Sequence, residues 1–490
     1  MRLFDKEPRP IREADLLSFL PHEWPEADLR ARIRAATLAS GRKVVVLDDD
    51  PTGTQTVHDL PVLTKWTVEA LAEAWDGAGT TFYVLTNSRR YPLDEAAAIN
   101  REIACNLAVV ARSRGAEPAV VSRSDSTLRG HYPGEVAALQ GTLEQELGVA
   151  YDGVIIVPFF LEGGRLTAND VHWVREGDRL TPAAQTEFAR DLTFGYTHSD
   201  LRSWVAEKTG GRVQADDVVS IDLDVVRREG PAGVANVLWG IHGGQVVVAN
   251  AISYRDLEVL VWGLLQAEGR GKRFLFRTAA SFVKVRGGIP DRGLLTRDEL
   301  FTLQEVSAHG GLTLAGSYVQ RTTQQLHEAL HLPGVRGIEL QVTAVLDESR
   351  RGPEIDRVLQ ETTQGLQNSD EVVVYSSRDL TVPSGMSQLE ASQLVSSALV
   401  EVLSRLAVRP AYLVAKGGIT ASDLATDALG VRQAWVLGQI VPGVPVWRLG
   451  AESKYPGLPY VVFPGNVGGP DALARAIAIL NGEEPETAHT

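Results

Sequence analysis

Short runs of β-branched and aromatic residues alternate along this chain with longer stretches in which apolar residues recur at helical spacing. Residues 43–47, "KVVVL", have the character of a buried strand, and residues 94–115 have a helical period that ends at Gly115. Strands that alternate with helices are usually parallel, because a crossover helix returns the chain to the same end of the sheet. The pattern therefore predicts an α/β fold built on mainly parallel sheets.

The alternation weakens between Ala280 and Thr296 and resumes with the strand pattern "LTLAG" at 312–316. A chain of 490 residues is also longer than one hydrophobic core usually supports. We therefore expect two domains, each a mainly parallel sheet flanked by helices, with a ligand cleft between them. The expected division is 1–305 for the first domain, of which 1–40 is an extension, and 306–490 for the second.

Composition and charge narrow the range of partners. The formal net charge is −14, so neither nucleic acid nor an anionic membrane is expected, and an anionic ligand needs a local positive pocket. The single cysteine, Cys105, excludes an intramolecular disulfide and a multi-cysteine metal site. The N-terminus lacks the apolar run of a signal peptide, and no apolar run is long enough to span a bilayer. We expect a cytoplasmic protein and leave a homodimer open.

The segments that follow the predicted strands differ between the two halves. Ligands of parallel α/β sheets bind outside the carboxyl ends of the strands, so these segments are the candidate binding loops. The first-half segments are rich in Asp, Arg, Ser and Thr, whereas the second-half segments are rich in Gly, Ser and Thr. The segments are "DDDPTGTQ", "NSRRYP", "SRSDSTLRG" and "EGGRLTANDVHW" in the first half, and "GSYVQRT", "KGGITASD" and "PGNVGG" in the second.

Three glycine-containing turns in the second half each follow a strand pattern and precede a helix pattern, beginning near Ser317, Gly417 and Gly465. Such turns let backbone N–H groups approach a phosphate without interference from a Cβ atom. Each turn alone is weak evidence, because glycine also simply ends helices and forms tight turns. Together they favour a phosphate-binding domain, and the absence of a GxxxxGK[ST] motif disfavours a P-loop NTPase.

The first half suggests a small, polar, anionic ligand. Its basic residues at strand ends can grip a carboxylate bidentately, and its Asp, Ser and Thr side chains can bind hydroxyl groups. A lone arginine is more often a surface ion-pair partner, but several at neighbouring strand ends favour a shared pocket. His131 and His172 are more simply structural than catalytic. The candidate residues are Arg89, Arg123, Asp125, Ser126, Thr127, Arg129 and Arg165.

Three adjacent carboxylates, Asp48, Asp49 and Asp50, follow the first strand. Adjacent like charges need water, a basic side chain or a cation to offset them. Asp48-x-Asp50-x-Thr52 also matches the DxDx[TV] motif of haloacid-dehalogenase-like phosphatases, in which Asp48 would be the nucleophile and Mg²⁺ would assist. That class also needs an acidic pair after a late apolar strand, and we find none in the sequence. The phosphatase stays an alternative hypothesis.

The blocks "DDPTGT", "SDSTLRG", "GGRLTANDVHW", "GSYVQRT", "AKGGITASDLATDALGV", "VPGVPVW" and "PGNVGG" resemble, in order, those of the four-carbon acid sugar kinase family. This family includes 3-oxo-tetronate kinases and threonate kinases, and the resemblance covers about residues 43–480. It implies an N-terminal sugar-acid-binding domain and a C-terminal nucleotide-binding domain. It also implies transfer of the γ-phosphate of ATP, with Mg²⁺, to the terminal hydroxyl of a tetronate-type acid.

Carried over residue by residue, the resemblance assigns roles to positions that also lie at predicted strand ends. The resemblance implies that Asp49 and Asp50 lie in the substrate or metal region. We hypothesise that one of them accepts or orients the hydroxyl proton, with Asp125 as the second choice, and that Arg89 and Arg123 anchor the carboxylate. The remaining acid-binding candidates are Thr52, Ser126, Arg129 and Arg165, and the ATP-binding candidates are Ser317, Gly417, Gly418, Ile419, Thr420 and Gly465. The metal ligands stay unassigned.

The chain departs from the family pattern mainly in its acid-binding half. The usual DDxTGA is "DDPTGT" here, with Asp48 in front, and the 1–40 extension is not part of the common pattern. These departures leave open which acid is used.

A third hypothesis is a sugar-acid-sensing protein with a degenerate nucleotide domain, which would bind the acid without turnover.

Overall fold

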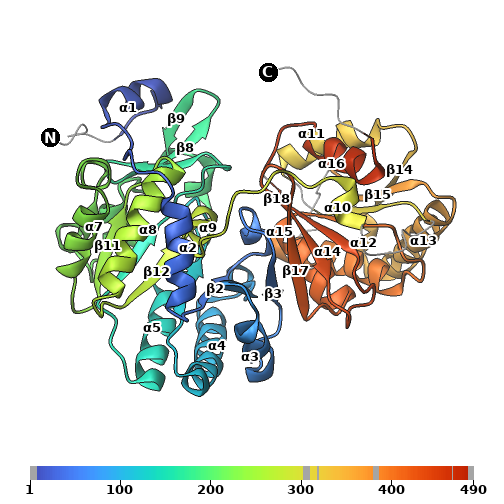
Figure 1. The fold of residues 1–490 in the computed structure, drawn as a ribbon. Coiled ribbons are helices and arrows are strands. Elements are labelled where there is room, and N and C mark those ends of the chain that lie inside the picture. The colour runs from blue at the N-terminus through green and yellow to red at the C-terminus, as the bar shows by residue number, and fades with distance from the viewer. Residues whose placement is uncertain (1–7, 302–308, 317–318, 379–385, 466, 484–490) are drawn as a thin grey trace. The chain divides into compact units, whose positions relative to one another are not determined.

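The structure is a computed structural model of the chain, and it describes residues 8–301, 309–316, 319–378, 386–465 and 467–483. It forms two compact units (Figure 1): one contains residues 1–57 and 65–291, and the other contains residues 58–64 and 292–490. The division of function at 305/306 stays a prediction. Within the described residues, no helix is both long enough and apolar enough to cross a bilayer.

The main sheet of the first unit consists of parallel strands in the order β10–β11–β6–β12–β5–β2–β4. Its central strands are β-branched runs buried on both faces, as expected for a parallel sheet covered by helices. All carboxyl ends therefore lie at one edge. The strands are β2 (Val44–Asp48), β4 (Thr81–Leu85), β5 (Ala119–Arg123), β6 (Gly153–Val157), β10 (Val219–Ile221), β11 (Gln245–Ala249) and β12 (Phe274–Thr278).

Helices of the first unit pack in two groups beside this sheet (Figure 1): α4 packs with α3 and α5, and α8 packs with α2, α7 and α9. Gly115 adopts a left-handed conformation and ends α4, as the sequence predicts. The helices are α1 (Glu13–Phe19), α2 (Leu29–Ala39), α3 (Val68–Asp76), α4 (Leu93–Arg114), α5 (Gly134–Leu147), α6 (Leu201–Lys208), α7 (Gly230–Trp239), α8 (Tyr254–Glu268) and α9 (Ala280–Arg286).

A small antiparallel sheet, in the order β1–β9–β8–β7, also belongs to the first unit. Its strands are β1 (Ile11–Arg12), β7 (Arg165–Ala168), β8 (Val171–Glu176) and β9 (Arg179–Pro182). The N-terminal extension supplies its edge strand, β1, and packs Trp24 over Gly230, where an added Cβ would meet the indole ring at 2.5 Å. The described part of the extension is thus integrated into the first unit.

The sheet of the second unit has the order β3–β17–β18–β19–β16–β13–β15–β14. Its strands from β19 to β14 are parallel, whereas β3, β17, β18 and β19 pair antiparallel. The strands are β3 (Leu60–Leu63), β13 (Leu312–Ala315), β14 (Val335–Leu340), β15 (Glu371–Ser376), β16 (Leu413–Lys416), β17 (Gln433–Val441), β18 (Val444–Leu449) and β19 (Pro459–Phe463). The prediction of two α/β domains with mainly parallel sheets is confirmed.

The helices of the second unit follow the alternation predicted from the sequence. Ser387 caps α14 with a reciprocal bond to Glu390, so this helix begins where its Ser-x-x-Glu sequence indicates. A π-helical turn, Leu424–Ala428, follows α15. The helices are α10 (Arg297–Phe301), α11 (Gln320–Leu330), α12 (Val342–Val345), α13 (Glu348–Gln367), α14 (Gln388–Arg405), α15 (Gly418–Asp423) and α16 (Ala472–Asn481).

A buried glutamate in the second unit predicts a pH-dependent stability. Glu371 Oε2 accepts hydrogen bonds from the Tyr412 hydroxyl at 2.5 Å and the Gly311 N–H at 3.2 Å, and burial raises the pKa of Glu371 to about 7. A carboxyl whose pKa is raised on folding contributes stability below its unfolded pKa and loses it as the pH rises through the folded pKa. We expect Glu371→Gln to keep the hydrogen bonds and to become more stable relative to wild type as the pH rises from about 4.5 to about 7.

The measurement is the difference in unfolding free energy between the variant and wild type across that pH range, which cancels the contributions of other titrating groups. The control is Glu401→Gln, since Glu401 forms an exposed ion pair with Arg405 at 3.2 Å. A Glu371→Gln difference that stays flat with pH would contradict the assignment of a protonated Glu371.

Candidate functional site

The aspartate triplet lies at the carboxyl edge of the first unit's sheet. Asp48, the last residue of β2, is level with Leu85 of β4 on one side and with Arg123 of β5 on the other. The loops after β2, β4 and β5 therefore meet at one place, although they are far apart in the sequence. This is the location predicted for ligands of parallel α/β sheets.

Asp48 is 1% exposed, and a buried arginine offsets its charge. Its Oδ1 accepts a hydrogen bond from Arg123 Nη1 at 2.9 Å. Gly53 lies directly over the carboxylate, since a Cβ added there would meet Asp48 Oδ2 at 1.9 Å. Burial raises the pKa of Asp48 to about 7, although Arg123 opposes the shift. Asp48 is thus packed beneath the loop and does not face open space.

Asp49 and Asp50 share Arg89, which follows β4. Arg89 Nη2 lies 2.8 Å from Asp49 Oδ1 and 3.4 Å from Asp50 Oδ2. Asp50 Oδ1 also accepts bonds from the Thr52 N–H at 2.8 Å and the Thr52 hydroxyl at 2.5 Å. Burial opposes the ionisation of Asp50, but Arg89 and Thr52 outweigh it, so the pKa of Asp50 lies below its ordinary value. Asp50 is therefore an ionised carboxylate held in a fixed direction.

Asp125 completes the cluster from the loop after β5. Its Oδ2 accepts a bond from Arg129 Nε at 2.8 Å and another from the Thr127 hydroxyl, and its Oδ1 lies 3.8 Å from Arg89 Nη1. Burial opposes its ionisation, but Arg129 and Arg89 outweigh it and hold the pKa of Asp125 well below its usual range. Arg89 thus lies close to Asp49, Asp50 and Asp125 at once.

The other predicted acid-binding residues lie around this cluster. The guanidinium groups of Arg165 and Arg129 lie over the same ring, Phe188, at 5.4 and 5.3 Å from its centroid. The backbone carbonyl of Ser126 accepts a bond from His172 Nε2 at 2.7 Å, so this histidine supports the loop. His172 is buried, and burial lowers its pKa to about 4, which fits the structural role predicted for it.

His131 also supports the backbone, since its Nε2 lies 2.9 Å from the Tyr91 carbonyl.

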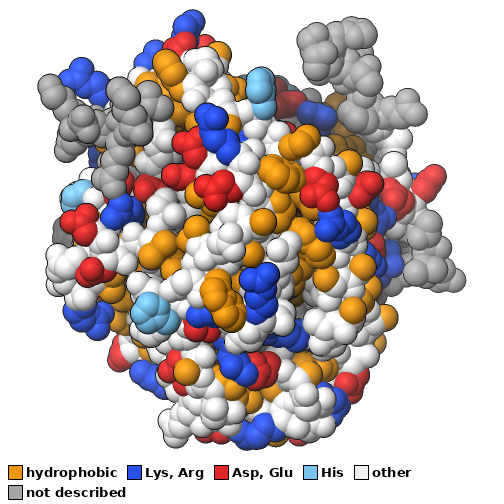
Figure 2. All heavy atoms as spheres, turned by 60° about the vertical axis from the view of Figure 1, so that its left-hand side comes forward, with side chains coloured by type: hydrophobic (Ala, Val, Ile, Leu, Met, Phe, Trp, Pro, Cys, Tyr) orange, Lys and Arg blue, Asp and Glu red, His pale blue; other side chains and the backbone are white. Residues whose placement is uncertain are grey.

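On the face that Figure 2 draws, acidic and basic side chains are interspersed among the described residues. This arrangement is typical of a solvated surface, whereas a surface that binds the nucleic-acid backbone concentrates positive charge.

In the second unit, the predicted turn after β16 forms the start of α15. Gly417 has φ +112°, a conformation that side-chain-bearing residues rarely adopt, and its N–H donates to the Phe463 carbonyl at 2.8 Å. The first N–H groups of a helix have no acceptor within the helix, so Gly418, Ile419 and Thr420 offer donors here. The Ile419 side chain is 50% exposed, so that residue can serve through its backbone.

The loop after β19 lies against helix α11. The Thr322 hydroxyl donates to the Gly465 carbonyl at 3.4 Å, and Gln325 Nε2 donates to the carbonyls of Val467 and Gly469 at 3.0 and 2.8 Å. The loops after β16 and β19 are adjacent, because these two strands pair in parallel. Ser317, the remaining ATP-binding candidate, lies outside the described residues.

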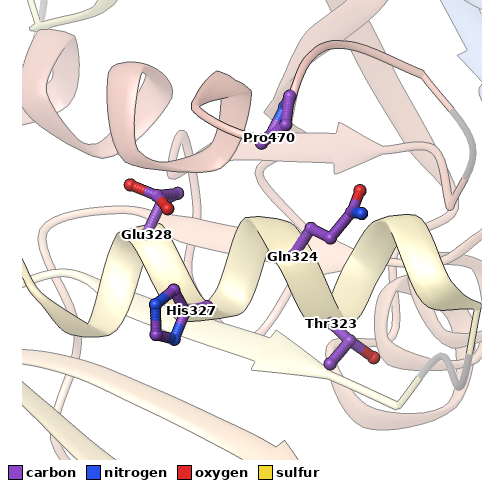
Figure 3. Close-up of a pocket in the computed structure, with 5 residues that line it drawn as sticks. All are labelled: Thr323, Gln324, His327, Glu328 and Pro470. Atoms are coloured by element: carbon purple, nitrogen blue, oxygen red, sulfur yellow. The ribbon is translucent and has the colours of Figure 1, made fainter.

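A hollow of about 450 Å³ lies between α11 and Pro470 (Figure 3). Thr323, Gln324, His327 and Glu328 of α11 line it together with Pro470. Among the described residues, its lining includes no lysine or arginine to pair with a triphosphate.

Two cations at strand ends were absent from the predicted site residues. Lys416 is fully buried at the end of β16, where its Nζ donates to the Pro464 carbonyl and lies 4.3 Å from the Phe463 ring centroid. Burial lowers the pKa of Lys416 to about 7. Arg277, near the end of β12, is 1% exposed and lies among the first-unit loops. Each is the one charged residue of its strand, which is the signal that could have identified it.

The described carboxylates were considered as ligands of a metal ion held by the protein alone. No group of three or more His, Cys, Asp or Glu side chains among the described residues could hold a metal ion. The first-unit aspartates are instead matched with Arg89, Arg123 and Arg129. Mg²⁺ in phosphoryl-transfer sites is commonly held by substrate phosphates with one or two carboxylates, so these residues do not define its ligands.

Comparison with known proteins assigns a class to each half of the chain. Residues 44–286 match the model of a sugar-binding N-terminal domain, and residues 312–473 match that of a nucleotide-binding C-terminal domain. The chain therefore contains a domain of the sugar-binding type followed by a domain of the nucleotide-binding type. The protein belongs to the four-carbon acid sugar kinase family, also described as family DUF1537.

Two solved structures share the fold. The Haemophilus influenzae protein HI1011, of family DUF1537, has a TM-score of 0.59 and 18% identity, over 89% of this chain and 100% of that one. A protein from Salmonella typhimurium LT2, described as a putative tRNA synthase, has a TM-score of 0.62 and 17% identity, over 89% of this chain and 98% of that one. The comparison with curated proteins finds no match. None of these findings supports the phosphatase hypothesis.

Proposed function

We propose that this protein transfers the γ-phosphoryl group of ATP to the terminal hydroxyl of a four-carbon sugar acid of the tetronate, 3-oxo-tetronate or threonate type. The observation that carries the proposal is the arginine–aspartate cluster at the strand ends of the sugar-binding domain, in a chain that also has a nucleotide-binding domain. Arginines and carboxylates together suit a ligand that is both an acid and a polyol.

The nucleotide would bind at the glycine-containing turns of the second unit. The N–H groups of Gly418, Ile419 and Thr420 would donate to phosphate oxygens, and the Gly465 loop would lie beside them. Lys416 ends β16, and its Nζ donates to the Pro464 carbonyl at the start of the loop after β19, so it contacts the beginning of both loops. A nearby phosphate would favour the charged form of this lysine. Positioning and charge neutralisation of this kind supply most of the catalysis in phosphoryl transfer.

The acid would bind at the cluster of the first unit. In the reaction, the terminal hydroxyl oxygen forms a bond to the γ-phosphorus, the bond from that phosphorus to ADP breaks, and the hydroxyl proton passes to a carboxylate. Asp50 is the best placed to accept or orient this proton, because its side chain is 17% exposed, compared with 3% for Asp49. Asp125, at 13%, is the second candidate.

The decisive test is a coupled ATP-consumption screen against C4 to C6 aldonic and keto-aldonic acids. We expect ADP formation that depends on both the acid and the protein, with mass spectrometry detecting one phosphoryl group on the terminal oxygen of a four-carbon acid. The matching polyols without a carboxylate are the controls, and we expect them to be poor acceptors because the arginines then lack an anion to bind.

Two other outcomes would refute the kinase and establish one of the two alternative functions. Phosphate release from sugar phosphates without ATP, together with a trapped phosphoryl group on Asp48, would establish the phosphatase. Tight acid binding without turnover, whatever nucleotide is supplied, would establish the sugar-acid-sensing protein.

A further inference from the structure

Arg277 is a buried arginine whose hydrogen-bonding capacity is mostly unused. It lies near the end of β12, level with Ser122 of β5 and Ile156 of β6, and it is 1% exposed. Its Nη2 donates to the Arg129 carbonyl at 3.0 Å, whereas its Nε and Nη1 have no hydrogen-bond partner among the described residues. Asp49 and Asp125 are near enough to act on its charge, but among the described residues neither forms an ion pair with it. Buried donors without partners are costly, so these two N–H groups are suited to the oxygens of a ligand.

The guanidinium is held in place by aromatic packing. Its Cζ lies 5.2 Å from the ring centroid of Trp204 in α6, and Trp204 stacks on Tyr132 with centroids 4.9 Å apart and an interplanar angle of 21°. Stacking on an aromatic face leaves the N–H donors of an arginine in the plane of its fork, where a carboxylate binds. Arg277 is therefore oriented before any ligand arrives.

Arg165 is a second cation with a free donor in the same region. Its Nε is buried and has no hydrogen-bond partner among the described residues, and its guanidinium lies over Phe188. Arg129 links the two cations, since its carbonyl accepts a bond from Arg277 Nη2 and its guanidinium lies over the same Phe188 ring as that of Arg165. Both guanidinium groups thus lie near Arg129, which pairs with Asp125 of the aspartate cluster.

The other arginines of the site are already engaged by aspartates. Arg89 is 2.8 Å from Asp49, Arg123 is 2.9 Å from Asp48, and Arg129 is 2.8 Å from Asp125. Arg89 and Arg123 each keep an unpartnered Nε, but an acid bound there would share the guanidinium with a buried aspartate. Among the described residues, Arg277 and Arg165 form no ion pair with a carboxylate, although Asp125 acts electrostatically on both.

We propose that Arg277, with Arg165 as its partner, binds the carboxylate of the sugar acid, and that Arg89 and Arg123 hold the catalytic aspartates instead. This inference rests on the proposed function and adds to it the orientation in which the acid binds. The carboxylate would lie toward Trp204 and Phe188, and the hydroxyl chain would extend toward Asp125 and Asp50. Arg277 and Arg165 thereby take the carboxylate-anchoring role expected from the sequence for Arg89 and Arg123.

The test is calorimetric binding of a four-carbon aldonic acid and of its neutral amide. We expect Arg277→Met to weaken acid binding by roughly 10- to 100-fold, the scale for lost hydrogen bonds to a charged group, and to leave amide binding unchanged. Arg165→Met should have a smaller effect of the same kind. The matched control is Arg273→Met, at the other end of the same strand, where the side chain pairs with Glu117 at 2.9 Å.

Two further variants separate binding from folding. Arg277→Lys keeps the positive charge but lacks the paired, coplanar N–H donors of a guanidinium. It should therefore bind the acid more tightly than Arg277→Met but less tightly than wild type. Arg277→Ala opens space beside Trp204, and millimolar guanidinium chloride should restore its acid binding but have no such effect on Arg273→Ala. Each variant is compared with wild type in ATP binding, which should not change, and in thermal melting, which shows that the variant is folded at the temperature of the binding measurement.

Retention of acid-over-amide selectivity in Arg277→Met would overturn the inference, as would equal loss of acid and amide binding in a folded variant. These results differ from a failure of the proposed function. Absence of ATP consumption with every acid would refute the kinase, whereas acid binding that depends on Arg277 would still be measurable.

Discussion

Asp50→Asn is expected to lower kcat by roughly 10²- to 10⁴-fold, the range for loss of a positioned general base, with little change in ATP affinity. The amide cannot take the proton of the attacking hydroxyl, although it can still accept hydrogen bonds from Thr52. ATP affinity should persist because the proposed nucleotide site is in the second unit. Turnover is measured with the acid identified in the screen, and ATP binding is measured by calorimetry.

The control is Asp76→Asn, since Asp76 forms a surface ion pair with Arg114 at 2.6 Å and is far along the chain from the aspartate triplet. That variant should match wild type in both measurements. Full turnover by Asp50→Asn would remove Asp50 from the mechanism and leave Asp125 as the acceptor. Loss of ATP binding by Asp50→Asn would instead contradict the proposed division of labour between the two units.

Asp49 should respond differently from Asp50, because it is more deeply enclosed. Its Oδ1 pairs with Arg89, and its Oδ2 accepts a bond from the Ser124 hydroxyl at 2.8 Å. Asp49→Asn would remove one of the carboxylates that pair with Arg89. Arg89 could then shift, and the position of Asp50, which it also contacts, would change. A rise in KM for the acid along with a fall in kcat would therefore distinguish an organising Asp49 from a proton-accepting one.

Much of the fold could be predicted because buried parallel strands have a clear residue pattern. "KVVVL" and "EVVVYSS" lie on β2 and β15 as expected. The antiparallel part of the second unit was not predicted, because an apolar run shows burial but not its partner strand. Pro442 and Gly443 join β17 and β18 in a tight turn, with Gly443 at φ +78°, and a Pro-Gly pair between apolar runs is a signal that could have shown it.

Part of the site could be predicted, because functional side chains of parallel α/β proteins gather at the carboxyl ends of the strands. Asp48 and Arg123 are both last residues of strands, so their pairing follows from the rule that ligands and polar groups gather at that edge. Arg277 is the penultimate residue of β12, so its position could have marked it, but its role could not be predicted. That role depends on its contacts with Trp204 and Arg129 and on its two unpartnered donors, which only the three-dimensional structure shows.

Gly417→Val is the second substitution with a large expected effect, and it should weaken ATP binding by roughly 10-fold or more while sparing acid binding. At φ +112°, a side chain at this position costs on the order of 1–3 kcal/mol of strain. The chain can relieve that strain by rotating the turn, which would move the N–H groups of residues 418–420 away from the phosphates. ATP and acid affinities are both measured by calorimetry, and circular dichroism reports whether the second unit remains folded.

Gly430→Val is the matched control, because Gly430 also has a positive φ, +63°, and has nothing within 4 Å of where its Cβ would lie. It carries a backbone penalty of the same origin, outside the proposed phosphate-binding turn. If strain alone mattered, both variants would lose stability and ATP affinity together. If the turn at Gly417 holds the triphosphate, only Gly417→Val should lose ATP affinity once both are corrected for the folded fraction, and equal ATP affinity in the two variants would exclude this turn from the nucleotide site.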